Sequence, residues 1–223
     1  MFIPQKGIDI NMKSREPVLS KNHNVVQDFQ KQHYFILIGA STGGPKALQY
    51  VLTSIPKNIP ASILIVQHMP PIFTRSLAER LNDVCQITVK EAKNNESALM
   101  GYAYIAPGNC HLEINKTSDG SVFLSLSKAQ QVLGHRPSVD VLFKSAANNL
   151  DKNIIGVIMT GMGTDGANGV RELRKNTECY IIAQDEETSV VFGMPGSAID
   201  TGAVDDVVPL HEIASCILKR LVV

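Results

Sequence analysis

Apolar and polar positions follow two different rhythms along this chain, and the difference separates predicted strands from predicted helices. Apolar runs without alternation are typical of strands that are covered on both faces, as in a parallel sheet. Such runs occupy residues 34–40, 61–68, 153–160 and 179–185. Elsewhere, apolar residues recur every three or four positions, as on one face of a helix. We therefore predict helices over residues 44–55, 71–82, 138–150, 167–176, 195–202 and 210–223.

Residues at the ends of three of these segments are typical helix caps. Pro70 or Pro71 suits the first turn of the second helix, where no amide hydrogen is needed. Ser138 is a preferred N-cap residue for the third helix. Gly202 is expected to end the helix that starts at residue 195.

The middle of the chain has a different pattern. Short strand-like segments separated by turn residues occur at residues 87–92, 103–108, 111–116 and 121–127. The sequence TSDG between the last two predicts a hairpin. We interpret this region as an antiparallel addition. The whole pattern predicts an α/β fold: a doubly wound, mostly parallel sheet flanked by helices, with an antiparallel β insertion or edge.

Residues 1–33 differ from the rest of the chain. They are polar, show no sustained period and contain Pro4, Gly7 and Pro17. We interpret them as a flexible extension or linker remnant, which leaves residues 34–223 as the folded domain.

Composition and charge narrow the classes of function. Lys and Arg together number 21, as do Asp and Glu, so the formal net charge is zero and a nucleic-acid partner is not expected. No apolar segment approaches the roughly 20 residues of a membrane helix, so membrane insertion is not expected. The four cysteines show neither metal-ligand spacing nor a disulfide pattern, which favours a reducing, cytoplasmic location.

The first strand ends at a serine surrounded by small residues. Gly39-Ala40-Ser41-Thr42-Gly43 matches the pattern G-x-S-x-G, with a predicted strand before it and a helix after it. Such a turn exposes a serine hydroxyl at a helix N-terminus, where developing negative charge is stabilised. The turn can hold a nucleophile, bind a phosphate or serve only as a tight bend. Phosphate binding of the dinucleotide type is disfavoured, because no acid for a ribose hydroxyl ends the next strand.

Two further predicted strand ends carry reactive side chains. His68 follows the second strand and can act as a general base for Ser41 if the two strands are neighbours. Asp165 lies in the loop Gly161–Gly166, where it can orient the histidine. That loop also contains G-x-G-x-x-G, and Asp185 and Glu186 follow at a suitable distance, so a nucleotide site is the competing interpretation.

Ser41, His68 and Asp165 together suggest acyl-transfer chemistry. All three follow predicted strands of one sheet, and the carboxyl ends of parallel strands share one edge. Their order along the chain is Ser–His–Asp, which differs from the Ser–Asp–His order of α/β-hydrolases. His135 and Arg136, in GHRPSVD, either cap the following helix and brace a loop or, if the substrate is acidic, contact its carboxylates.

At these loops the sequence resembles the catalytic domain of the chemotaxis protein-glutamate methylesterases of the CheB type. The resemblance extends from about Phe35 to the C-terminus. The matching stretches are IGASTGGPKAL, VQHMPPIFTRSLAERL, YIAPG, GHRPSVDVLF, GVIMTGMGTDGANGV and AQDEETSVVFGMPGSAI.

The resemblance implies hydrolysis of γ-glutamyl methyl esters on the cytoplasmic helices of methyl-accepting chemoreceptors, with deamidation of receptor glutamines as a further activity. It implies that Ser41 is the nucleophile, His68 the base and Asp165 the orienting carboxylate. The Met162 amide then contributes to the oxyanion site, and Thr42 lines the same turn. The family needs no cofactor or metal.

Members of this family typically carry an N-terminal receiver domain, and the 33 residues before the domain are too few for one. Three expectations follow: a naturally separate enzyme with a separate receiver-type regulator, a diverged stand-alone member, or an excised part of a longer protein. Two other functions stay open: a nucleotide-binding regulatory module that uses the Gly161 loop, and an inactive relative that only docks on receptors.

Overall fold

The computed structural model describes residues 1 and 32–221. The expected extension over residues 1–33 lies almost entirely outside the described residues, apart from Met1, Gln32 and His33. The strands are β1 (Tyr34–Ala40), β2 (Ala61–Gln67), β3 (Thr88–Glu91), β4 (Glu96–Ser97), β5 (Tyr102–Ile105), β6 (His111–Lys116), β7 (Val122–Ser127), β8 (Ile154–Ile158), β9 (Cys179–Gln184) and β10 (Asp206–Val208). The helices are α1 (Gly44–Thr53), α2 (Phe73–Val84), α3 (Val139–Asn149), α4 (Ala167–Asn176), α5 (Gly193–Ile199) and α6 (Leu210–Arg220).

A seven-stranded parallel sheet with the order β10-β9-β8-β1-β2-β5-β3 forms the centre of the domain. Strand β1 lies between β2 and β8, so the chain winds outward from β1 in both directions. The strand order therefore reverses direction at β1, and ligand sites of α/β sheets lie at the carboxyl ends of the strands at such a point. The predicted fold class is confirmed.

Two of the four middle segments were misplaced by the sequence-based interpretation. Strands β3 and β5 are parallel members of the large sheet, with β5 bonded to both β2 and β3. Only β4, β6 and β7 form the small antiparallel sheet, in which β6 and β7 are the predicted hairpin. Because a pattern of short strands does not reveal the neighbour of each strand, parallel and antiparallel pairing could not be told apart.

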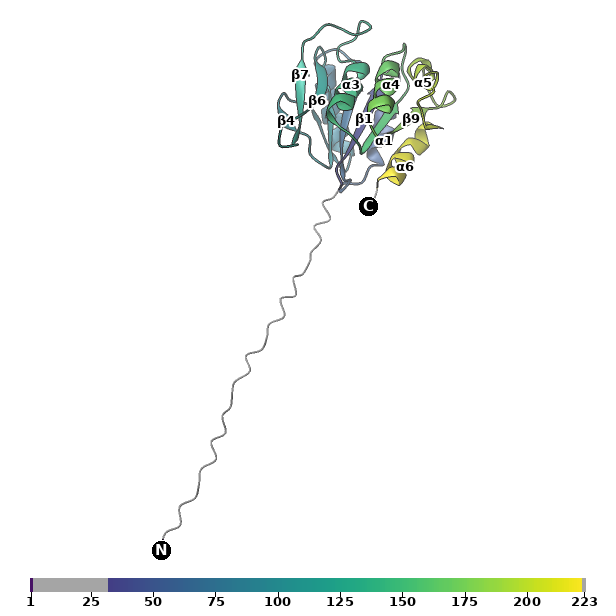
Figure 1. The fold of residues 1–223 in the computed structure, drawn as a ribbon. Coiled ribbons are helices and arrows are strands. Elements are labelled where there is room, and N and C mark those ends of the chain that lie inside the picture. The colour runs from purple at the N-terminus through teal and green to yellow at the C-terminus, as the bar shows by residue number, and fades with distance from the viewer. Residues whose placement is uncertain (2–31, 222–223) are drawn as a thin grey trace. The chain divides into compact units, whose positions relative to one another are not determined.

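The central strands β1, β2 and β8 are buried on both faces because each face of the sheet packs on its own layer (Figure 1). One core joins the inward sides of α1, α2 and α6 to alternate residues of β1, β2 and β8, among them Ile36, Ile63 and Ile155. The other core joins α3, α4, α5 and the small sheet to the intervening residues, among them Leu37, Leu64 and Ile154. Continuous apolar strands follow from this arrangement.

The start of α2 differs from the expectation for the prolines. The helix begins at Phe73, and Ile72 precedes it with φ 77° and ψ −49°. Pro70 and Pro71 lie before the helix, against Gly108, where an added Cβ would come within 2.3 Å of the Pro71 nitrogen. By contrast, Ser138 caps α3 as predicted, since its hydroxyl accepts the Val141 amide.

Three further findings concern residues 32–221. No helix there is long and apolar enough to cross a membrane. No cluster of His, Cys, Asp or Glu in that range is arranged to hold a metal ion. The four cysteines are free thiols.

Candidate active site

The candidate site lies where β1, β2 and β8 end side by side. Ala40 and Gln67 are register partners, so the next residues, Ser41 and His68, leave the sheet at the same level. The His68 amide donates to the Ala40 carbonyl at 3.1 Å. On the other side, the Ser41 amide donates to the Thr160 carbonyl at 3.0 Å. Parallel pairing thus brings together three loops that are far apart in sequence.

His68 and Asp165 form a direct contact at this edge. The imidazole Nε2 lies 2.7 Å from Asp165 Oδ2, and the side chains are only 7% and 1% exposed. The other ring nitrogen, Nδ1, is buried and has no hydrogen-bond partner among the described residues. With Nε2 donating to the carboxylate, Nδ1 is the nitrogen with a free lone pair.

The carboxylate of Asp165 sits against the N-terminus of α3. It accepts hydrogen bonds from the Val139 amide at 2.7 Å, the Asp140 amide at 3.0 Å and the Ser138 hydroxyl at 2.8 Å. Burial alone would raise the pKa of Asp165, but the hydrogen bonds from His68 and from α3 outweigh it and hold that pKa below 3.8. Asp165 is therefore held as an anion, and its Oδ2 is the acceptor that faces His68 Nε2.

The sequence did not predict this cradle, which consists of the Val139 and Asp140 amides and the Ser138 hydroxyl. It identified Ser138 as a cap but gave no sign that the amides behind it would receive Asp165. The helix N-terminus offers unpaired N–H groups and a partial positive charge, both of which favour an anion. The only sequence signal was the Ser-Val-Asp run at a predicted helix start.

The loop after β8 approaches Ser41 closely. An added Cβ on Gly161 would lie 2.3 Å from Met194 Sδ and 2.8 Å from Ser41 Cβ, so any side chain there would force its neighbours to shift. Met162 follows at once, and its side chain is 72% exposed while its amide faces no acceptor within residues 32–221. The Thr42 amide, in the turn that ends at Gly43 with φ 82°, also has no acceptor in that part of the chain. Two unpaired N–H groups thus flank Ser41.

The dinucleotide interpretation of the Gly161 loop finds little support in this geometry. Asp165 lies inside the fingerprint and its carboxylate is already engaged by His68 and by α3. Asp140 accepts the Gly166 and Gly169 amides at 2.9 and 2.7 Å. These amides of the α4 N-terminus are the groups that a pyrophosphate would need.

His135 lies directly on His68. The two rings are stacked with centroids 3.9 Å apart and an interplanar angle of 6°. The neighbouring Arg136 donates to the carbonyls of Lys128 and Ala129 and to Asn109, so it braces its own loop. Of the two roles considered for this pair, the structure assigns loop bracing to Arg136. The stack itself had no signal in the sequence, because His135 is far from His68 along the chain.

The stack predicts a pH dependence of stability. Burial lowers the pKa of His135, the facing His68 ring acts in the same direction, and Asp165 opposes both. A histidine with a lowered folded pKa binds its proton more readily when unfolded, so its contribution to stability is full above pH 6.5 and is lost as the pH falls below that value.

His135→Phe keeps a flat ring but removes this titration. We expect the Tm difference between pH 7 and pH 5 to be smaller in this variant than in the wild type; an equal difference would contradict the prediction.

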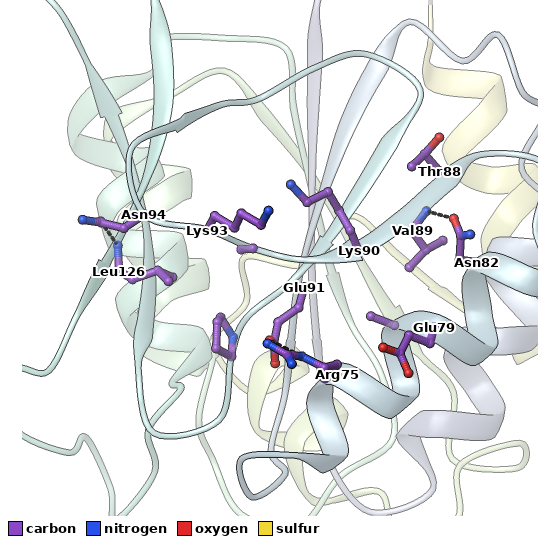
Figure 2. Close-up of a pocket in the computed structure, with 13 residues that line it drawn as sticks. Arg75, Glu79, Asn82, Thr88, Val89, Lys90, Glu91, Lys93, Asn94 and Leu126 are labelled. Carbon is purple, nitrogen blue, oxygen red and sulfur yellow. Dashed lines mark hydrogen bonds and ion pairs between the residues drawn. The ribbon is translucent and has the colours of Figure 1, made fainter.

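Two surface cavities differ in their chemistry. One of about 560 Å³ opens beside His68 and His135 and is also lined by Met69, Pro70 and Pro71. The other, of about 720 Å³, lies between α2 and β3 and is shown in Figure 2. Some of its charged side chains are paired, since Arg75 Nε lies 3.7 Å from Glu91 Oε2. The Val89 amide donates a hydrogen bond to Asn82 Oδ1 at 2.9 Å. Of Ser41, His68 and Asp165, only His68 lines the smaller cavity and none lines the larger one, so the smaller cavity is the one that adjoins the candidate site.

Comparison with known families agrees with the arrangement of these loops. The family described as CheB methylesterase matches residues 36–217. The chain belongs to the CheB methylesterase family. The match covers every strand of the parallel sheet and all three loops of the candidate site, from Ser41 to Asp165.

Individual relatives and a solved structure lead to the same family. A protein-glutamate methylesterase/protein-glutamine glutaminase of Burkholderia pseudomallei is 54% identical over 186 residues, which are 83% of this chain and 50% of that protein. One of Geobacter metallireducens is 50% identical over 211 residues, covering 94% and 56%. The crystal structure of the Thermotoga maritima CheB methylesterase catalytic domain matches with a TM-score of 0.81 and 43% identity, covering 84% of this chain and 98% of that one.

This chain spans about half the length of the curated CheB relatives that it matches. It matches nearly all of the solved catalytic domain. The shared region therefore corresponds to the part of the family that the Thermotoga maritima structure represents.

Proposed function

We propose that this chain is a serine esterase that removes methyl groups from γ-glutamyl methyl esters of chemoreceptors. The observation that carries the proposal is the buried pair of His68 and Asp165 at the strand end beside Ser41. Membership of the CheB methylesterase family supports the choice of a glutamyl methyl ester among acyl substrates. In this proposal residues 34–223 are the catalytic domain and residues 1–33 an extension.

The first step forms an acyl-enzyme. Ser41 Oγ attacks the γ-carbonyl carbon while its proton passes to Nδ1 of His68, the nitrogen that is free of Asp165. The carbonyl oxygen becomes an oxyanion, and its donors in this proposal are the Met162 and Thr42 amides, which have no acceptor within residues 32–221. The imidazolium then protonates the methoxy oxygen, the C–O bond breaks and methanol leaves.

The second step regenerates the enzyme. Water attacks the glutamyl ester of Ser41 as His68 Nδ1 accepts one of its protons. The second tetrahedral intermediate collapses, Ser41 leaves with that proton, and the glutamic acid side chain is released and ionises by giving its proton to the solvent. Asp165 stays ionised throughout and stabilises the imidazolium, in line with its lowered pKa. Neither step uses a cofactor or a metal.

The same residues can act on a glutamine side chain, with ammonia as the leaving group. The curated relatives are named for both activities. We infer that the partner is the cytoplasmic helical region of a methyl-accepting chemoreceptor, so the protein acts in the cytoplasm. Control by a receiver domain, joined to this chain or separate from it, is part of the same proposal.

The proposal is tested by methanol release from membranes that contain radiolabelled, methylated chemoreceptors. Purified protein should raise the rate of release well above that of membranes alone. A titration with NAD and ATP in parallel tests the competing nucleotide interpretation. Absence of methanol release, together with saturable nucleotide binding, would contradict the esterase proposal and favour the nucleotide-binding function.

Adjacent substitutions separate the backbone of the oxyanion loop from its side chains. Gly161→Ala places a methyl group 2.8 Å from Ser41 Cβ, so the loop or the serine must move. We expect kcat to fall by about 10- to 100-fold, since small misplacements near reacting atoms are costly. Met162→Ala keeps the amide and removes only an exposed side chain, so kcat should stay within about threefold. Steady-state kinetics of both variants checks this, and equal effects would contradict it.

A further inference from the structure

Thr160 is a buried residue that joins the Ser41 turn to two other loops. It is 1% exposed and follows β8 directly. Its carbonyl accepts the Ser41 amide at 3.0 Å, and its hydroxyl donates to the Thr42 carbonyl at 2.9 Å. Thr160 thereby holds the peptide group before the serine through its backbone and the peptide group after Thr42 through its side chain.

The same hydroxyl also organises the loop that follows β9. It accepts the Val191 amide at 3.1 Å, and the next residue, Gly161, donates its amide to the Val191 carbonyl at 2.9 Å. The Thr160 amide is held in turn by Gln184 Oε1 at 2.9 Å. Thr160 therefore couples the serine turn to Gly161 and so to the amide of Met162.

Gln67 holds the turn from the opposite side. This last residue of β2 is 2% exposed, and its Nε2 donates to the Ser41 carbonyl at 2.9 Å and to the His68 carbonyl at 3.2 Å. Its Oε1 lies directly under the turn, since an added Cβ on Gly44 would come within 1.9 Å of it. One amide thus connects the backbone of the serine with that of the histidine.

We propose that Thr160 and Gln67 are positioning residues that hold the Ser41 turn from its two sides, in line with His68 and with the oxyanion amides. The inference rests on the proposed esterase function and adds two residues that touch no reacting atom. A side chain in a turn has few contacts of its own; Ser41 Oγ has no hydrogen-bond partner within residues 32–221. Its direction is therefore set by the peptide groups that Thr160 and Gln67 hold.

Thr160→Val is the direct test, because valine has the same shape and lacks the hydroxyl. It leaves the Thr42 carbonyl without a donor and the Val191 amide without an acceptor. We expect kcat for methanol release to fall by about 10- to 100-fold with KM within about twofold, because alignment and not binding is lost. Thr160→Ser keeps the hydroxyl and should recover kcat to within about threefold of the wild type.

Thr74→Val is the matched control. Thr74 is equally buried, and its hydroxyl likewise accepts a backbone amide, that of Gly108 at 3.1 Å, and donates to Glu91 at 2.7 Å. This variant should lose stability without a comparable loss of kcat. The inference would be overturned if Thr160→Val kept the wild-type kcat, if Thr160→Ser failed to restore it, or if Thr74→Val lowered kcat as much.

Gln67→Met provides a second, independent measurement. It removes both donated hydrogen bonds at nearly constant length, and the same fall in kcat at unchanged KM is expected. If both Thr160→Val and Gln67→Met failed to fold while Thr74→Val folded, the two residues would be structural and the inference wrong. The wild type in the same assay reports on the esterase function itself: inactive wild type contradicts that function, whereas an active wild type with an equally active Thr160→Val contradicts only the positioning role.

Discussion

Ser41→Ala is expected to lower the turnover of a glutamyl methyl ester by about 10⁴-fold or more, with any residual rate coming from substrate binding and the oxyanion amides. The loss is large because Ser41 is the residue that leaves β1 beside His68, directly after the Ala40–Gln67 pair. KM should change little, since the hydroxyl acts on the transition state and contributes little to binding the substrate.

The fold should survive this substitution. The Ser41 hydroxyl has no hydrogen-bond partner among residues 32–221, and the bonds that hold the turn are made by its backbone. Methanol release and thermal unfolding, measured on the same preparation, separate the two effects. Ser215→Ala is the control, an exposed serine on α6 that should leave turnover unchanged. Near-normal methanol release by a folded Ser41→Ala protein would rule out Ser41 as the nucleophile.

Asp165→Asn should produce the second largest effect, a fall in turnover of about 10⁴-fold. An amide in place of the carboxylate can present its oxygen or its nitrogen to His68, but the Val139 and Asp140 amides and the Ser138 hydroxyl also need acceptors. If the oxygen serves α3, the nitrogen faces His68 Nε2 and favours the wrong tautomer.

The same substitution has a stability signature in acid. The cradle amides left without an acceptor cost about 1–3 kcal/mol at neutral pH. In the wild type, a carboxyl group whose pKa is held below 3.8 stabilises the fold fully above that value, and the contribution is lost as the pH falls through the lowered folded pKa. The gap in Tm between the wild type and Asp165→Asn should therefore be wide at pH 7 and narrower near pH 3.

Asp205→Asn is the matched control for this experiment. Asp205 also accepts a backbone amide, that of Ile181 at 2.7 Å, and pairs with Arg174, but it lies near the start of β9, away from the candidate site. It should lose stability and keep its turnover. An Asp165→Asn enzyme with full activity would make Asp165 a purely structural residue.

Much of the fold was predictable because the strands are buried on both faces. The apolar run at residues 34–40 would be unfavourable on a solvent-exposed surface, which indicates a strand in the centre of the sheet. Strand β1 has those bounds. Helix α4 matches its predicted residues 167–176 because its apolar positions recur at helical spacing between polar ones. Strands β4 and β10 were missed, since they have two and three residues and are only partly buried.

The pairing of the middle strands was not predictable from the same pattern. Strand β5 is apolar enough to be central, yet only its register with β2 places it in the parallel sheet. The cradle of Asp165 and the stack of His135 on His68 also depend on how α3 and its preceding loop pack. Contacts of this kind join residues that are tens of positions apart, so the local spacing of apolar and polar residues does not predict them.

The sequence alone determined the alternation of strands and helices, the glycine-wrapped serine at the end of the first strand, and the family that its motifs resemble. These are local properties, set by side-chain period, turn chemistry and residue type. The tertiary structure alone decided which nitrogen of His68 is free, what holds Asp165 ionised, and which buried side chains hold the Ser41 turn. The physical reason is that hydrogen bonds at strand ends depend on sheet order and register, which place β1 between β2 and β8.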